Sequence, residues 1–422
     1  MEDNKSYSQK TLDALEGGQI EESNHFYSWA LRKDDDETLY NLAGELFALG
    51  FDGKALRIYK KLLKTYPSDD DLKILTAEIL VDQNENDQAL ALLDQVPDDS
   101  EYHVQALMVE ADLYQTEELF EVSERKLLEA YQISPDEPAI QLALGELYFS
   151  MQNYAKAVKY YLALIKQGIP EMSKINLVER LAVSYAGDGK FEKAMAYFEQ
   201  IHDEDLTTDI LMQEGITYLQ MDEFERAQEI LEDVLKRDNS YSSAYPYLIQ
   251  AYAKDEQWDK GLHTAQLGLA VDQYNPDLYL LAAEMAEHAK DNELVGKYLQ
   301  KAYELEPDNS AILIRLTDFY NRQEMYDKTI ALDSNEITDP QLNWNLAVAY
   351  WQLDQFEMAQ EHFENASHNL DNQADFLSDY YHFLRENGDL PKAVDVLRKL
   401  VNIRSTDVDL QEELEQLEDQ GY

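Results

Sequence analysis

The chain has 422 residues, 45% of them hydrophobic, and 85 Asp and Glu against 35 Lys and Arg give it a formal net charge of −50. A chain so acidic lacks the basic footprint that nucleic acids require and the polybasic segments that bind anionic membranes, which excludes both as partners. The absence of cysteine excludes disulfides, thiolate catalysis and cysteine metal sites.

The N-terminal residues 1–5 have neither the basic nor the apolar region of a signal peptide. The longest apolar run, 278–283, is much shorter than a membrane span. We therefore expect a cytoplasmic protein.

A small residue recurs from residue 55 to residue 393 at spacings of 34, 34, 34, 37, 33, 34, 34, 34, 30 and 34. Its members are Ala55, Ala89, Ser123, Ala157, Ala194, Ala227, Gly261, Val295, Thr329, Ala359 and Ala393. A second, mostly aromatic series, from Phe47 to Leu384, keeps nearly the same spacing. Apolar residues recur at helical spacing twice within a unit, as at 142–148 and 158–165, so each unit predicts two short helices and no strand.

Two departures from the period divide the chain into blocks. A longer loop at 167–173 and a shortened segment at 333–340 separate repeat blocks at 37–170, 171–335 and 336–405. Residues 1–36 are a degenerate N-terminal repeat or cap, and residues 406–422 are a capping helix and tail. Segment 333–340 predicts a weak joint, which is either a tolerated shortened helix or a functional hinge.

The unit with Leu144-Gly145, Tyr148, Ala157 and Tyr161 resembles the tetratricopeptide repeat (TPR) family, whose unit is a helix–turn–helix of about 34 residues. The resemblance implies an all-α fold, an α-solenoid forming a right-handed superhelix of about twelve repeats with a C-terminal capping helix. Gly or Ala lets two helices approach closely while a neighbouring ring fills the space above. The acidic, cysteine-free composition also resembles the cytoplasmic TPR proteins of Gram-positive (Firmicute) bacteria.

The family resemblance implies that the first helix of each unit lines a concave groove. In this register the partner-binding positions are Glu45, Ile74, Glu78, Met108, Asp112, Leu142, Glu146, Phe149, Met212, Leu219, Leu280, Glu284, Ile314, Asp318, Trp344 and Trp351. Apolar rows flanked by acids predict a peptide, helix or protein partner with apolar anchors beside Lys or Arg. The alternative is that the apolar members are partly buried and the acids are simply solvated.

The family's known clamp for the acidic C-terminal tails of chaperones needs basic residues that this chain lacks. One of its basic positions falls here on Asp71, Gln105, Asp209, Asp277 and Asp375, and only Arg180 and Arg315 stand at the other. The sequence therefore predicts no binding of chaperone tails.

No phosphate-binding loop, dinucleotide-binding or metalloprotease motif is present in the sequence. His362 and His368 do not fall on one helical face, so they do not predict a metal site. We expect no catalytic residues, no metal and no cofactor.

The sequence favours a non-enzymatic scaffold or adaptor for protein partners. The family resemblance leaves open delivery of a partner to a protease, a kinase or an envelope-synthesis enzyme. The alternative is a peptide-sensing regulatory TPR protein, although repeats that begin near residue 37 leave little room for a DNA-binding module before them.

Overall fold

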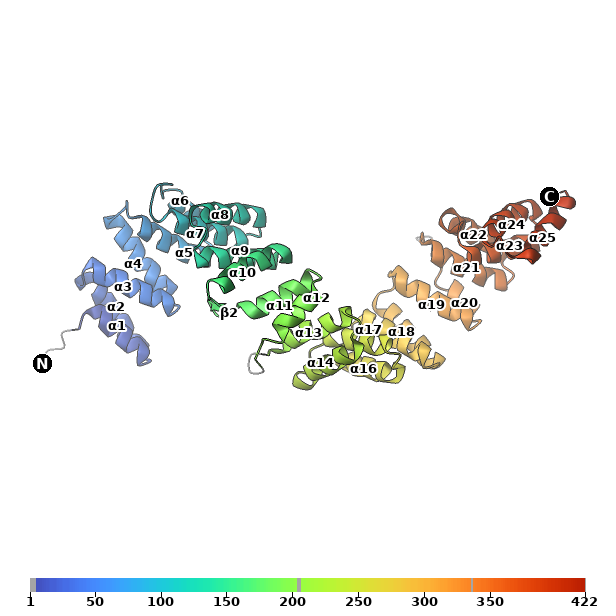
Figure 1. Ribbon diagram of the computed structural model, residues 1–422, viewed down its shortest axis with the longest axis horizontal. Helices are drawn as coiled ribbons and strands as arrows, with labels where there is room; N and C mark the ends of the chain where they lie inside the picture. The colour runs from blue at the N-terminus through green and yellow to red at the C-terminus, as the bar shows by residue number, and fades with distance from the viewer. Residues whose placement is uncertain (1–4, 203–205, 335–336, 422) are drawn as a thin grey trace. The chain divides into compact units, whose positions relative to one another are not determined.

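The computed structural model describes residues 5–202, 206–334 and 337–421, and within these ranges it contains twenty-five α-helices and one two-stranded β-hairpin. Consecutive helices pack as antiparallel hairpins in chain order (Figure 1). The predicted all-α solenoid of helix–turn–helix units is therefore confirmed. The figure of about twelve repeats stays a prediction, because one helix is only five residues long.

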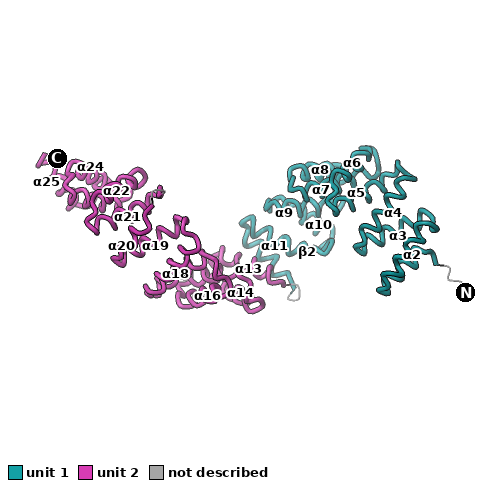
Figure 2. Tube along the Cα trace, turned by 180° about the vertical axis from the view of Figure 1, so that it is seen from behind, with its two compact units in different colours: residues 1–205 teal, residues 206–422 magenta. Residues whose placement is uncertain are grey.

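The chain forms two compact units, Met1–Asp205 and Leu206–Tyr422 (Figure 2). The helices of the first unit are α1 Tyr7–Glu16, α2 Ile20–Lys33, α3 Asp36–Ala48, α4 Asp52–Thr65, α5 Asp70–Asp82, α6 Asn86–Leu93, α7 His103–Thr116, α8 Phe120–Ile133, α9 Pro138–Ser150, α10 Tyr154–Lys166, α11 Leu177–Gly187 and α12 Phe191–Phe198. Strands β1 Glu171–Met172 and β2 Ile175–Asn176 lie between α10 and α11.

The second unit begins with α13 and ends with the predicted capping helix, α25. Its helices are α13 Thr208–Gln220, α14 Phe224–Arg237, α15 Ala244–Lys254, α16 Trp258–Val271, α17 Pro276–His288, α18 Asn292–Leu305, α19 Ser310–Arg322, α20 Tyr326–Ile330, α21 Pro340–Gln352, α22 Phe356–Leu370, α23 Ala374–Glu386, α24 Leu390–Ile403 and α25 Val408–Asp419. The division of the repeats into blocks at residues 170 and 335 stays a prediction.

Every member of the small-residue series is buried, as close packing between paired helices requires. Gly145 shows the steric reason. A Cβ placed on Gly145 would lie 2.5 Å from Cε1 of Tyr161, so the ring of this fully buried tyrosine occupies the space that any side chain there would need.

A second periodic feature, which the sequence analysis did not use, is the turn between the two helices of each hairpin. One turn residue has a positive φ, and it is glycine in only some of the units. The residues are Gly18, Gly50, Asn84, Glu118, Gln152, Gly189, Asp222, Glu256, Lys290, Glu324, Asp354 and Gly388. The next backbone N–H returns to the helix, as where Glu85 N–H donates to the Leu80 carbonyl, and this bond ends the first helix.

The long loop at 167–173 includes the first strand of a β-hairpin, which the sequence analysis did not predict. Glu171 pairs with Asn176 and Met172 with Ile175, in antiparallel register. Ser173 and Lys174 form the turn with φ of 52° and 66°, the left-handed pair that two-residue hairpins need. The usual Asn-Gly signal for such a turn is missing here, so the strands could not be recognised from sequence.

The shortened segment lies where α20 ends, and residues 335 and 336 of the predicted joint 333–340 lie outside the described residues. Asp333 stands where an apolar residue is normal. Its Oδ2 accepts a hydrogen bond from the Tyr350 hydroxyl at 2.7 Å and lies 3.2 Å from Nε2 of His362. Nδ1 of the buried His362 lies 2.8 Å from Oδ1 of Asn343. A buried polar network thus replaces apolar packing at this joint, and its role as a hinge stays a prediction.

Candidate partner-binding surface

The predicted groove residues all lie on the first helices of hairpins. In the first unit they lie on α3, α5, α7 and α9, and in the second on α13, α17, α19 and α21. The repeat spacing used to choose these residues therefore placed all of them on the intended helix of each hairpin. Their exposure to solvent, however, differs greatly along the chain.

Four of the apolar positions belong to the core, which corrects the expected exposed row. Ile74, Leu142, Met212 and Leu219 are 0%, 7%, 4% and 8% exposed, respectively. Ile74, for example, packs in a cluster formed by α5, α6 and α7, so the next hairpin covers it. The alternative of buried apolar members is correct at these four positions.

The other apolar positions keep part of their surface in solvent. They are Met108, Phe149, Leu280, Ile314, Trp344 and Trp351. These six predicted positions therefore keep apolar surface in solvent, and their use by a partner stays a prediction.

Acidic residues form a cluster on α5 and α7. Burial raises the pKa of Glu78 above its ordinary value, and the carboxylates of Asp82 and Asp112 raise it further. Burial also raises the pKa of Asp112, again with a contribution from Asp82. Asp82 itself has a raised pKa because of burial and the charge of Asp52. These carboxylates repel one another, so a bound cation would stabilise all of them.

Asp82 was missed by the sequence analysis. It follows Glu78 by four residues on α5, one helical turn further along the same face. This spacing was visible in the sequence, but it lies one turn beyond the positions that the repeat register selected.

Glu146 already binds a cation of the same chain. Its carboxylate accepts hydrogen bonds at 2.9 Å from both Nε and Nη2 of Arg180, on α11, and one of 2.6 Å from the Tyr161 hydroxyl. The Arg180 guanidinium also lies over the Phe149 ring, 4.4 Å from its centroid. An acid and an aromatic ring one turn apart on α9 therefore hold a guanidinium by a bidentate ion pair and a cation–π contact.

In the second unit, the two tryptophans of α21 are tied to the following hairpin. Nε1 of Trp344 donates to Asp379 at 3.0 Å, and Nε1 of Trp351 donates to Glu386 at 2.9 Å. Burial raises the pKa of Asp379. The two indoles thus have fixed orientations on α21.

The remaining predicted acids differ in their pairing. Glu45 is exposed, Glu284 is half-buried, and Asp318 is paired with Arg322 at 3.0 Å. Arg315, at one of the clamp positions, donates to the Leu280 carbonyl at 3.3 Å. Arg180 and Arg315 are therefore both engaged within the chain.

Residues 5–202, 206–334 and 337–421 contain no group of three His, Asp or Glu arranged to hold a metal ion. His362 contacts Asn343 and Asp333 instead. In the same part of the chain, no helix combines the length and the apolar character needed to cross a bilayer.

Comparison with known families finds TPRs along much of the chain. The family described as YpiA-like, tetratricopeptide repeats matches residues 115–169, and its C-terminal counterpart matches residues 340–407. General tetratricopeptide repeat families match residues 53–110 and 208–241. The TPR repeat-containing protein YpiA of Bacillus subtilis (strain 168) is 35% identical over 416 residues, which is 98% of each of the two chains.

Solved structures show a more distant likeness, of the fold alone. The Naa15/Naa10 complex bound to HypK-THB contains a chain that is 18% identical, with a TM-score of 0.40, over 90% of this chain and 65% of that one. The C-terminal part of a TPR repeat-containing protein from Cytophaga hutchinsonii is 12% identical, with a TM-score of 0.45, over 64% of this chain and 97% of that one.

Proposed function

We propose that this chain, which belongs to the YpiA-like family of tetratricopeptide repeat proteins, is a non-enzymatic scaffold for a partner with basic and apolar side chains. TPRs imply a protein–protein interaction scaffold, and proteins built from them are generally not enzymes. The partner is therefore a protein or peptide. Its basic–apolar character and its place on the first helices are the specific parts of the proposal.

The contact that supports this proposal most directly is that of Arg180 with Glu146 and Phe149. An arginine of the chain itself occupies an acidic–aromatic pair on the first-helix face. A Lys or Arg of a partner would find the same two kinds of group, carboxylate and apolar, elsewhere along that face. The internal contact supports the proposal, because it holds a cation with these two kinds of group.

The acids on α5 and α7 are the position where a partner cation gains most. Glu78, Asp82 and Asp112 form no ion pair within the described ranges, and their raised pKa values show that their charges are poorly stabilised in the free protein. The half-buried Met108 lies four residues before Asp112, one turn away on α7. An apolar anchor on Met108 and a cation among the three acids match a short amphipathic basic segment.

The test is binding of a fluorescein-labelled peptide of Lys and Leu, followed by anisotropy. Replacing Glu78 with Gln and Asp112 with Asn should weaken binding about tenfold, because two attractive charges are lost. The same double variant should unfold at higher urea concentration at pH 7, because the repulsion among the acids is relieved. Weaker binding together with higher stability separates loss of the surface from loss of the fold.

The matched control changes Glu121 and Glu129 to Gln on α8. Both are exposed, and both lie on a second helix, so net charge changes equally while the first-helix face is intact. The proposal expects this control to bind the peptide as the wild-type protein does. Equal weakening in both variants would reduce the effect to overall charge and contradict the proposed surface.

A further inference from the structure

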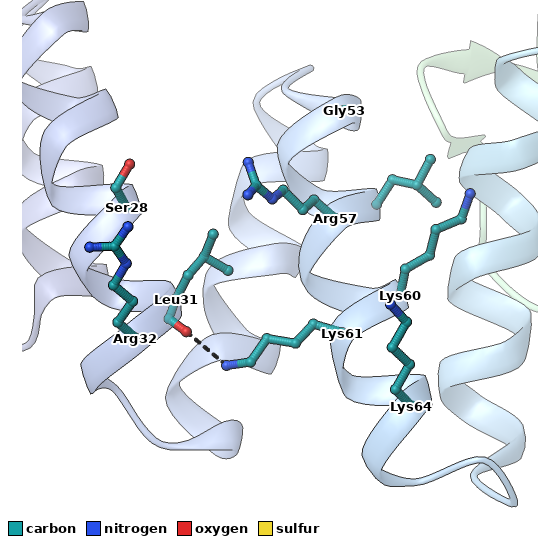
Figure 3. A pocket seen from close by; sticks show the side chains of 9 residues that line it. Ser28, Leu31, Arg32, Gly53, Arg57, Lys60, Lys61 and Lys64 are labelled. Atoms are coloured by element: carbon teal, nitrogen blue, oxygen red, sulfur yellow. Dashed lines mark hydrogen bonds between the residues drawn. The ribbon is translucent and has the colours of Figure 1, made fainter.

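A hollow of about 590 Å³ lies between α2 and α4, the second helices of the first two hairpins. Every charged residue that lines it is basic, in a chain with 85 acidic residues. The lining residues are Ser28, Leu31, Arg32, Gly53, Leu56, Arg57, Lys60, Lys61 and Lys64. Figure 3 shows Arg57 and Lys61 reaching from α4 toward the helix that carries Leu31 and Arg32.

Among the described residues, no carboxylate forms an ion pair with these cations. Arg32, Arg57, Lys60 and Lys64 are exposed and form no ion pair in the part of the chain that the structure describes. Lys61 donates to the Leu31 carbonyl at 2.9 Å and so links α4 to the last turn of α2. In the described ranges, most other arginines are paired with a carboxylate, Arg125 and Arg315 being the exceptions; the paired ones are Arg180, Arg226, Arg237, Arg322, Arg385, Arg398 and Arg404.

The spacing of the cations on α4 makes them repel one another. Arg57 and Lys61 are four residues apart, and so are Lys60 and Lys64, which places like charges on adjacent turns of the helix. Acids outnumber bases along the chain, yet these bases are grouped on one helix, where their repulsion lowers its stability. A local arrangement that works against the stability of the fold is typical of functional sites.

Two of the residues that line the hollow, Gly53 and Ser28, are small. Gly53 has no side chain, and a Cβ added there would meet nothing within 4 Å. Ser28 is small and exposed. The half-buried Leu31 and Leu56 contribute an apolar surface. The hollow can therefore accept an apolar side chain while the surrounding cations bind carboxylates.

We propose that this hollow binds an acidic peptide segment of a protein partner, with Asp or Glu side chains on the Arg and Lys and an apolar side chain between Leu31 and Leu56. An anionic membrane fits less well, because a flat bilayer would also face the acidic surface of a chain with a net charge of −50. A narrow peptide contacts the basic hollow alone. The proposal does not rest on the first-helix surface, which lies on other helices and takes the opposite charge.

The experiment measures anisotropy of a short fluorescein-labelled peptide of Glu and Leu with the full chain. Changing Arg57, Lys60 and Lys64 together to Gln should weaken binding at least about tenfold, because three attractive charges are lost while helix propensity is kept. Gly53→Phe should weaken binding as well, because its ring fills the hollow without changing any charge.

The matched control changes Lys166, Lys254 and Lys297 to Gln, which removes the same charge from exposed positions elsewhere. This control should bind the acidic peptide as the wild-type protein does. Equal weakening in both triple variants, or full binding by Gly53→Phe, would overturn the proposal.

Sedimentation with phosphatidylglycerol vesicles tests whether an anionic membrane binds the hollow instead of a peptide. Vesicle binding that requires Arg57, Lys60 and Lys64, without peptide binding, would also overturn it.

Discussion

The hairpin of α9 and α10 and the joint formed by α20, α21 and α22 solve the same packing problem in different ways. In both, a tyrosine hydroxyl donates to a carboxylate, from Tyr161 to Glu146 and from Tyr350 to Asp333. In the first, the tyrosine ring lies on a glycine. In the second, α20 is only five residues long, and polar groups occupy the space that a longer helix would have filled.

The comparison shows two ways to stabilise a repeat. One tolerates little change in side-chain shape, and the other tolerates an irregular gap between helices. The α9–α10 hairpin is stabilised mainly by shape, because the burial of Tyr161 against Gly145 leaves little room for change. The α20–α22 joint is stabilised by hydrogen bonds among Asp333, Tyr350, His362 and Asn343. Such a network can bridge an irregular gap, but every member must keep its partner.

The largest expected effect is at the shape-stabilised hairpin. Tyr161→Ala removes a fully buried ring above Gly145 and should lower the free energy of unfolding by about 3–5 kcal/mol. Hydrogen exchange should show the loss in α9 and α10. Tyr274→Ala is the control, since Tyr274 is 73% exposed, and its effect should stay within about 0.5 kcal/mol. Unchanged protection of α9 and α10 in Tyr161→Ala would contradict the proposed role of shape.

The second largest effect on the free energy of unfolding is expected at the α20–α22 joint. Asp333→Ala leaves the Tyr350 hydroxyl and His362 without their acceptor, which should cost about 1–3 kcal/mol. Asp333→Asn keeps an acceptor oxygen and should lose less. Hydrogen exchange in α21 and α22 measures both. If the Asn variant lost as much as the Ala variant, charge and not hydrogen bonding would hold the joint.

Alkaline pH should weaken both regions in the same way. Burial raises the pKa of Tyr161, and its hydrogen bond to Glu146 raises it further. Burial and the hydrogen bond to Asp333 do the same for the pKa of Tyr350. The unfolded chain releases these protons near pH 10 and the folded chain does not, so the stabilisation is complete below pH 10 and is lost above it, by about 1 kcal/mol per tyrosine between pH 10 and 11.

The measurement compares urea midpoints at pH 9 and pH 11. The double variant Tyr161→Phe, Tyr350→Phe should lose less stability between the two values than the wild-type protein. Tyr274→Phe, at an exposed position, should behave as the wild-type protein does. If the double variant lost as much stability between pH 9 and pH 11 as the wild-type protein, the loss would come from other groups.

The smallest effect concerns the turn within each hairpin. Gln152 and Asp354 have φ of 56° and 58°, a conformation that is strained for residues with a Cβ. Gln152→Gly and Asp354→Gly should each raise the free energy of unfolding by about 0.5 kcal/mol, since relief of strain exceeds the entropy that glycine adds to the unfolded chain. Gly388→Ala, at φ 81°, should act in the opposite direction. Urea midpoints measure all three, and a gain for Gly388→Ala would contradict the strain argument.

The sequence predicted the fold well because the packing of each hairpin repeats. A small residue at one phase and a ring at another are local requirements, so Gly145 and Tyr161 are recognisable without any structure. The exposure of each predicted groove residue depends instead on how the neighbouring hairpin covers it. Ile74 and Met108 hold the same place in the repeat, yet Ile74 is fully buried and Met108 is only partly buried. The basic hollow was missed because it forms only where α2, with Arg32, packs beside the four cations of α4.

Arg180 has a consequence for selectivity along the first-helix face. Any outside cation that seeks Glu146 must displace a guanidinium that already makes two hydrogen bonds to it and stacks on Phe149. On the proposed surface, that position would therefore favour a ligand that matches the resident arginine over a single flexible lysine. If a partner binds as proposed, Arg180 occupies the acid on α9, and Glu78, Asp82 and Asp112 on α5 and α7 are the acids that a partner cation would contact first.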